Sequence, residues 1–357
     1  MPKAQAKLIT NKSNIRYLSN FTGSSGFMLL TKNKSYLFTD FRYIERAKNC
    51  IKKGLEIIDT TKLWKNKKEL KRNWQKILKK HKVKTLGIEE SNLTVTQFKK
   101  YKKISGKIKY TDISGEIEEK RAIKSKEEIK LLTKSQRINE KVFLEIKKIV
   151  QKHIEQKKRT PLYEIDLAWR IKELGNKYGA EDVSFDPIVA FGKNSAIPHH
   201  MPGKTKLKKG DIVLIDMGMK YKGYCSDMTR TFFTSKPKQE HLDIYNTVLE
   251  AQLNGIKKIK AGTTGKNADA YSRDIIKKAG YGEAYGHAGG HGIGLDIHET
   301  PSLSENFAKK FKENTVVTVE PGIYLEGKIG VRIEDMILIT KNGNKNLMKI
   351  TKNPFLN

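Results

Sequence analysis

Two aspartates in an apolar setting, Asp216 and Asp227, are the first residues whose placement suggests chemistry. The run Ile212–Ile215 leads into Asp216, and Asp227 leads into the β-prone run Thr229–Thr234. This pattern predicts two strands in a hairpin about Tyr221–Lys222, with the two carboxylates opposite each other. Opposed residues have Cβ atoms roughly 4.5–5.5 Å apart, so the carboxylates would repel unless a divalent cation neutralised them. The alternative is one surface aspartate in a turn and a second, unrelated one.

A second pair of acids repeats this design. Glu320 ends a β-rich run, and Glu334 lies in the predicted strand Gly330–Ile339. A hairpin with its midpoint at Gly327 would bring the two acids together. Arg332 shares the strand face of Glu334, where it could orient or neutralise a negative group. Its alternative role is a structural ion pair.

The segment YGHAGGHGIGLDIHETP gathers three histidines, His287, His291 and His298. It is not a zincin helix, because the histidines lack the adjoining glutamate and the glycines would break a helix. No G-x-G-x-x-G dinucleotide fingerprint can be placed in it either. Glycines let the backbone pass close to a ligand, and histidine is the common nitrogen ligand and neutral-pH proton carrier. The segment therefore indicates a site rather than core packing.

His199 and His200 form a second histidine stretch, upstream of the first hairpin. Adjacent residues of an extended chain point in opposite directions, so at most one of the two is expected to face a site. The alternative is a pair of surface histidines.

Together these stretches supply four carboxylates and one imidazole suited to metal binding: Asp216, Asp227, His291, Glu320 and Glu334. Oxygen-rich ligands with a single imidazole suit a pair of divalent ions such as Mn²⁺, Co²⁺, Fe²⁺ or Zn²⁺. The chain has 2 cysteines, which excludes a thiolate cluster. Bridging carboxylates hold two ions ~3.5–4 Å apart, an arrangement that activates a water between them.

The elements that must position these residues fall into two groups, which predict an α+β protein with domains at residues 1–122 and 123–357. The N-terminal third alternates strands and helices, as a small α/β domain does. The second domain opens with a helix that begins at the capping box of Ser125 and Glu128. The other expected elements are strands at residues 15–20, 27–31, 35–40, 55–58 and 85–88 and helices at residues 43–52, 65–81, 160–178, 242–260 and 267–278.

Composition bounds the class of protein. The chain has 357 residues and a mean hydropathy of −0.60, and no apolar run approaches the ~20 residues of a membrane span. Because the N-terminus lacks the apolar core of a signal peptide, we expect a cytoplasmic protein with no membrane partner.

The formal net charge of +32 raises the question of nucleic-acid binding. The lysines, however, are spread along the whole chain, mostly in helix-like segments with glutamate interspersed, as on solvated faces. Neither a helix-turn-helix nor a zinc-finger or RNP-like motif accompanies them. A general lysine bias explains the charge at least as well, so we do not expect nucleic acid as a partner.

The order D-x10-D, HGIGLDIHE, VEPGIY and RIED resembles the pita-bread metallopeptidases, family M24, and within them the Xaa-Pro peptidases aminopeptidase P and prolidase. The resemblance covers nearly the whole chain. It implies a pita-bread catalytic domain at residues 123–357 after a creatinase-type domain at residues 1–122. It also implies hydrolysis of the bond before proline by a metal-bridging hydroxide, proline-containing peptides as substrates, and a homodimer. Two divalent metal ions are the implied cofactors, and Mn²⁺ is the ion we favour.

The resemblance assigns a metal role to each ligand. It implies that Asp216 chelates one metal and that Asp227 and Glu334 bridge both. It implies that His291 and Glu320 bind the other metal.

Catalytic and substrate-binding roles follow from the same resemblance. His199 and His298 match histidines that contact the substrate and stabilise the tetrahedral intermediate. Glu320 is placed to accept the proton of the attacking water and pass it to the leaving proline nitrogen. His287 and Arg332 match supporting positions at the substrate.

Several alternatives remain open at this point. An aminopeptidase leaves room for residues after proline, whereas a dipeptidase grips the proline carboxylate, and the sequence does not separate the two. Creatinase-like hydrolases lack the full metal set, and methionine aminopeptidases usually lack the large N-terminal domain. A non-catalytic basic protein of the same fold, which binds protein or nucleic acid, is the alternative from another class. Such members tend to lose ligands, which this chain has not.

Overall fold

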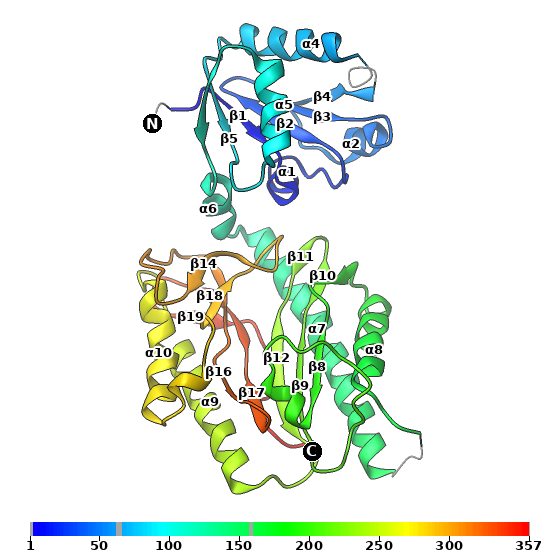
Figure 1. Ribbon diagram of the computed structural model, residues 1–357, viewed down its shortest axis with the longest axis vertical. Helices are drawn as coiled ribbons and strands as arrows, with labels where there is room; N and C mark the ends of the chain where they lie inside the picture. The colour runs from blue at the N-terminus through cyan, green and yellow to red at the C-terminus, as the bar shows by residue number, and fades with distance from the viewer. Residues whose placement is uncertain (1–2, 62–65, 157–159, 357) are drawn as a thin grey trace. The chain divides into compact units, whose positions relative to one another are not determined.

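The computed structural model describes residues 3–61, 66–156 and 160–356 (Figure 1). Contacts within the chain divide it into two compact units, residues 1–121 and 122–357. Both units mix helices with sheets, so the predicted α+β class is confirmed. Within the described residues, none of the helices combines the length and the apolar character that a membrane crossing requires.

The first unit is one six-stranded sheet with helices on both faces. In chain order its elements are β1 (Ala6–Ile9), α1 (Lys12–Ser19), β2 (Phe27–Thr31), β3 (Ser35–Thr39), α2 (Ile44–Cys50), β4 (Leu55–Asp59), α4 (Lys67–Lys80), β5 (Thr85–Ile88), α5 (Val95–Ser105), β6 (Lys109–Asp112) and α6 (Glu116–Ala122). The strand order is β4-β3-β2-β1-β5-β6. One face of the sheet packs on α4 and α5 through Trp74 and Tyr101, and the other packs on α1 and α2 through Ile15 and Ala47.

The strand predicted at residues 15–20 is wrong, because these residues belong to α1 and its C-cap. The side chain of Asn11 accepts a hydrogen bond from the backbone N–H of Asn14 and so caps the helix. Asn20 ends the helix in the left-handed conformation, with φ 66°. The strands expected at residues 27–31, 35–40, 55–58 and 85–88 are observed within one residue. The helix expected at residues 65–81 is α4, and residue 65 lies outside the described residues.

The second unit encloses its strands between two pairs of helices (Figure 1). In chain order its elements are α7 (Lys126–Glu155), α8 (Glu164–Lys177), β7 (Asp182–Val183), β8 (Ile188–Phe191), η1 (Gly192–Ala196), β9 (Ile212–Met217), β10 (Met219–Tyr221), β11 (Tyr224–Cys225), β12 (Met228–Phe233), α9 (Gln239–Lys258), α10 (Gly265–Lys278), η2 (Gly282–Ala284), β13 (Gly290–Gly292), β14 (Glu299–Leu303), β15 (Val316–Val319), β16 (Gly322–Leu325), β17 (Ile329–Arg332), β18 (Asp335–Ile339) and β19 (Asn344–Asn346).

Apolar side chains seal each helix pair to its own strands. Val142 of α7 and Ile171 of α8 are buried in one core with Val213 of β9. On the other side, α9 and α10 pack on β16 and β17 in a second core that includes Tyr245 and Val331. The strands that position the candidate site residues are thereby held between the two pairs of helices.

The helix expected from Thr160–Pro161 begins later, so that part of the prediction is wrong. Tyr163 forms an antiparallel bridge with Lys206, which keeps the chain extended until α8 starts at Glu164. The capping box at the start of α7 is confirmed, because Ser125 Oγ accepts from the Glu128 N–H and Glu128 Oε2 accepts from the Ser125 N–H.

Candidate metal centre

Asp216 and Asp227 come from the hairpin of β9 to β12, whose register differs from the predicted one. Asp216 lies opposite Thr229, so the prediction that it lies opposite Asp227 is wrong. The chain turns at Lys222–Gly223, where φ is 46° and 82°, and not at Tyr221–Lys222. Two positive φ angles give a turn whose twist matches that of the flanking strands. The register error is two residues, and side chains alternate with a period of two, so both aspartates keep the same face.

The second hairpin has the predicted register. The pairing of β15 with β18 and of β16 with β17 puts Glu320 directly across from Glu334. Its turn is centred on Gly327, which has φ 69°. The predicted single strand 330–339 is divided into β17 and β18, with Glu334 between them. Oε2 of Glu334 accepts a 2.7 Å hydrogen bond from Oγ1 of Thr229 in the first hairpin.

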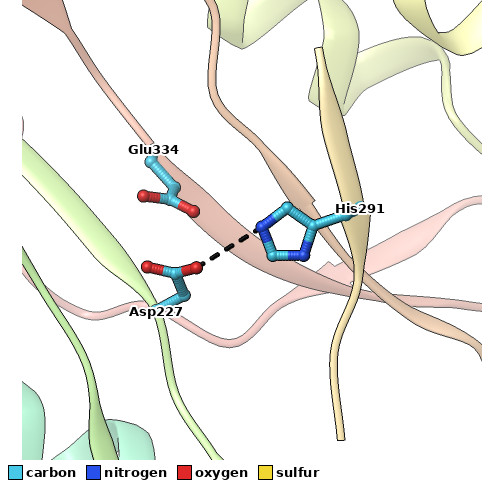
Figure 2. A group of neighbouring side chains, drawn as sticks. All are labelled: Asp227, His291 and Glu334. Carbon is cyan, nitrogen blue, oxygen red and sulfur yellow. Dashed lines mark ion pairs between the residues drawn. The ribbon is translucent and has the colours of Figure 1, made fainter. Parts of the chain in front are cut away.

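Three side chains from separate segments point toward one another, as Figure 2 shows: Asp227 just before β12, His291 in β13 and Glu334 between β17 and β18. One ligand atom each of Asp227, His291 and Glu334 lies within 4.8 Å of the other two. His291 Nε2 is 3.5 Å from Asp227 Oδ2 and 3.3 Å from Glu320 Oε1. Its Nδ1 lies 3.0 Å from the carbonyl of Gly292 and donates to it, which leaves the Nε2 lone pair directed at the carboxylates.

Burial and repulsion act against the charges of this cluster. Burial, and then the charges of Asp216 and Glu320, raise the pKa of Asp227 well above its ordinary value. Burial and the charge of Asp227 do the same to the pKa of Glu334. In the described part of the chain, Asp216 Oδ1, Asp227 Oδ1 and Glu334 Oε1 are buried without a hydrogen-bond partner. Burying carboxylate oxygens without a partner costs free energy. Divalent cations bound to these oxygens would offset that cost, so the residues fit a metal site.

Arg332 connects Asp216 to His287. Its Nη2 donates to Asp216 Oδ2 at 2.7 Å, and its Nη1 donates to the Tyr324 hydroxyl at 2.7 Å. That hydroxyl lies 3.0 Å from Nε2 of His287. Arg332 therefore forms an ion pair with a candidate ligand, and His287 is connected to that pair through Tyr324.

The remaining candidate histidines lie at different distances from the cluster. The ring centroid of His298 is 4.5 Å from that of His291, and burial, followed by the charge of His291, lowers the His298 pKa. His199 is exposed, and its charge also acts on His298. The side chain of His200 contacts a different residue, because its Nε2 lies 2.8 Å from the buried carboxylate of Glu164.

Residues 130–341 match the family described as Metallopeptidase family M24, and residues 3–123 match the Creatinase/Prolidase N-terminal domain. The chain belongs to metallopeptidase family M24. The predicted family is thus confirmed. The pita-bread fold, preceded in the sequence by a creatinase-type domain, and the prediction of a metal-dependent enzyme are confirmed with it.

Relatives of this M24 chain span both expected specificities. The Xaa-Pro dipeptidase of Pyrococcus horikoshii is 35% identical over 345 residues, which are 96% of this chain and 92% of the relative. The solved Xaa-Pro dipeptidase of Bacillus anthracis has a TM-score of 0.89 and 39% identity, and the match covers 99% of this chain and 95% of that one. An X-Pro aminopeptidase of Thermotoga maritima has a TM-score of 0.87 and 34% identity over 99% and 97% of the chains.

Thr229 and Tyr324 join the candidate site of this M24 member without having been predicted. Thr229 contacts both Glu334 and Arg332, and Tyr324 contacts both Arg332 and His287. A signal for Thr229 exists, since it shares a strand face with Asp227 two residues earlier. Hydroxyl side chains are common in strands, so this signal alone does not single it out.

Proposed function

We propose that the chain is an Xaa-Pro peptidase that hydrolyses the peptide bond before proline and uses two divalent metal ions. Mn²⁺ is the ion we favour over Co²⁺, Zn²⁺ and Fe²⁺. The observation that carries the proposal is the convergence of Asp227, His291 and Glu334 around unpaired carboxylate oxygens. The similarity to Xaa-Pro dipeptidases and to an X-Pro aminopeptidase supports the substrate class.

Five residues would hold the ions in this proposal. Asp216 would chelate one ion, Asp227 and Glu334 would lie between both, and His291 with Glu320 would bind the other. When bound, the ions supply Lewis acidity and bring the pKa of a bound water toward neutrality.

The chain's own groups then handle protons and charge. Glu320 accepts the proton of the attacking water and returns it to the proline nitrogen, which becomes the leaving amine. Its Oε1 already accepts a 3.0 Å hydrogen bond from Thr318, which fixes its orientation. The lowered pKa of His298 keeps its imidazole neutral near neutral pH, so one ring N–H can donate to the oxyanion. We assign His199 to the same substrate contact and His287 and Arg332 to substrate binding.

We also propose the domain limits 1–122 and 123–357, a homodimer and a cytoplasmic location. The division into compact units after residue 121 supports the domain limits. The resemblance to Xaa-Pro peptidases supports both the dimer and the location.

The direct test is to assay the purified protein with Mn²⁺ on Xaa-Pro and on Xaa-Pro-Yaa peptides. Cleavage of the first alone identifies a dipeptidase, and cleavage of the second identifies an aminopeptidase. Asp227→Asn should lose metal and activity together, while Asp243→Asn, an exposed aspartate of α9, should keep both. Cleavage of neither peptide overturns the proposal, and salt-dependent binding of nucleic acid by that inactive protein would favour the binding-protein alternative.

A further inference from the structure

A buried ion pair lies directly behind the carboxylate cluster. Arg230 follows Thr229 in β12, and Asp335 follows Glu334 at the start of β18. Nη2 of Arg230 donates to Oδ1 of Asp335 at 2.7 Å, and the two side chains are 3% and 0% exposed. Because adjacent side chains in an extended chain face opposite ways, this pair occupies the faces turned away from the candidate metal ligands.

The guanidinium of Arg230 also holds the backbone of a candidate ligand. Its Nη1 donates to the carbonyl of Glu334 at 2.6 Å and to the carbonyl of Thr229 at 3.0 Å. The Glu334 N–H donates to the same Thr229 carbonyl at 3.1 Å, and the Glu334 carboxylate accepts from Oγ1 of Thr229. Glu334 is therefore joined to the first hairpin through its N–H, its carbonyl and its side chain.

These contacts of Arg230 and Thr229 with Glu334 connect the two hairpins that supply the candidate metal ligands. Asp227 belongs to the hairpin of β9 and β12, whereas Glu334 belongs to the hairpin that leads into β18, and these strands lie in different sheets. The separation of the two carboxylates thus depends on contacts between sheets. Metal–ligand distances tolerate only about 0.2 Å, so a small shift of one hairpin would weaken metal binding.

Residues near the C-terminal end complete the surroundings of the pair. Nε and Nη2 of Arg230 donate to the carbonyls of Thr351 and Ile350. Oδ2 of Asp335 accepts from Lys352 Nζ at 2.6 Å and from Asn346 Nδ2 at 2.7 Å. All three guanidinium nitrogens of Arg230 therefore donate hydrogen bonds. Only the planar, forked guanidinium of arginine can donate in all of these directions at once.

We propose that Arg230 and Asp335 are positioning residues of the metal centre, which hold Glu334 at the separation from Asp227 that metal binding requires. This inference rests on the metal ligands of the proposed function. The pair acts through the backbone of Glu334 and through β12, not through the ligand atoms.

The test is Mn²⁺ titration by calorimetry on chelator-treated protein, with thermal unfolding of the metal-free form measured alongside. Partners of metal ligands typically contribute 10–100-fold to affinity, so Arg230→Lys should weaken Mn²⁺ binding at least about tenfold. Asp335→Asn should weaken it in the same direction by a smaller factor. Activity lost in Arg230→Lys should return at raised Mn²⁺ concentration, which general damage to the fold would not allow.

Arg137→Lys is the matched control. Arg137 also pairs with a carboxylate, Glu140, and donates to a carbonyl near the C-terminal end, that of Leu347. None of its described hydrogen bonds reaches Thr229 or Glu334. This variant should bind Mn²⁺ like the wild type, whatever its unfolding temperature.

Each outcome of the titration decides a different claim. Wild-type protein that binds no Mn²⁺ overturns the metal centre of the proposed function and this inference with it. Wild-type binding matched by Arg230→Lys overturns the inference alone. If Arg230→Lys does not unfold cooperatively, the Mn²⁺ affinity of Asp335→Asn is the deciding measurement. An affinity equal to that of the wild type then overturns the inference.

Discussion

The guanidinium of Arg332 and the carboxylate of Asp216 form a partly buried ion pair in which Nη2 lies 2.7 Å from Oδ2. The second oxygen of Asp216, Oδ1, is buried without a partner among the described residues. Burial raises the pKa of Asp216, and the charge of Arg332 acts against that rise. Arg332 therefore favours the ionised carboxylate, and its hydrogen bond to Oδ2 leaves Oδ1 available to a metal ion.

Replacing Arg332 by methionine should shift the acid limb of the activity profile to higher pH. Without the guanidinium the pKa of Asp216 rises further, so the carboxylate stays protonated to a higher pH and cannot bind metal. Mn²⁺ affinity near about pH 6 should fall roughly tenfold or more. The measurement is kcat/KM against pH together with calorimetry, and Arg170→Met, at an exposed pair with Glu173, is the control. Superimposable profiles for Arg332→Met and wild type would refute the role of Arg332 in keeping Asp216 ionised.

The metal-free protein should lose stability as the pH rises above the ordinary carboxyl range. Burial raises the pKa values of Asp227 and Glu334 above 3.8 and 4.5. In that window the folded state holds protons that the unfolded chain releases, so the unfolding free energy falls with increasing pH. Unfolding temperatures of chelator-treated protein should therefore fall more steeply with pH for wild type than for Asp227→Asn.

Two other sets of groups do not disturb this comparison. Burial lowers the pKa values of His287 and His298, which adds stability with rising pH, but equally in both proteins. Burial alone would raise the pKa of Asp335, but Arg230 and Lys352 hold it at about 2, below the window. Saturating Mn²⁺ should remove the part of the wild-type pH dependence that comes from Asp227 and Glu334, and equal slopes in the two metal-free proteins would contradict the prediction.

The two hairpins show how far the sequence predicts the site. Gly327 marks the second turn well enough to give the correct register of Glu320 with Glu334. In the first hairpin the turn falls one residue later than predicted, because Lys222 itself adopts a positive φ, which a lysine seldom does. The candidate ligand set survives the error because a shift of two residues preserves the face.

Other parts of the molecule could not be predicted from local pattern. The β-prone residues of 15–20 form a helix because caps at Asn11 and Asn20 and burial of Ile15 outweigh local preference. Arg230 gives no sequence signal for its contact with the Glu334 carbonyl, because that contact joins strands far apart in the chain. Roles for individual histidines likewise came from family resemblance and not from spacing.

Gly218 separates β9 from β10 between the two aspartates, and alanine there should disrupt the centre. An added Cβ would lie 2.0 Å from the carbonyl oxygen of Ser226 and 2.9 Å from Cβ of Ser184, so the backbone must move. Overpacking of this kind costs about 1–3 kcal/mol, and the displaced hairpin should also bind Mn²⁺ more weakly. Chemical denaturation and calorimetry measure both effects. Gly343→Ala is the control, because an added Cβ there meets no described atom within 4 Å. Wild-type stability in Gly218→Ala would show that the hairpin adapts freely.

Replacing His298 by alanine should separate catalysis from metal binding. His298 is stacked edge-on beside His291 but is not one of the proposed ligands, so Mn²⁺ affinity should stay near the wild-type value. Loss of an oxyanion donor should lower kcat by roughly 10²–10³. Peptide hydrolysis at saturating Mn²⁺ gives kcat, calorimetry gives the affinity, and His241→Ala in α9 is the matched control. A fall in Mn²⁺ affinity equal to the fall in kcat would make His298 a support of the metal centre instead of a donor to the substrate.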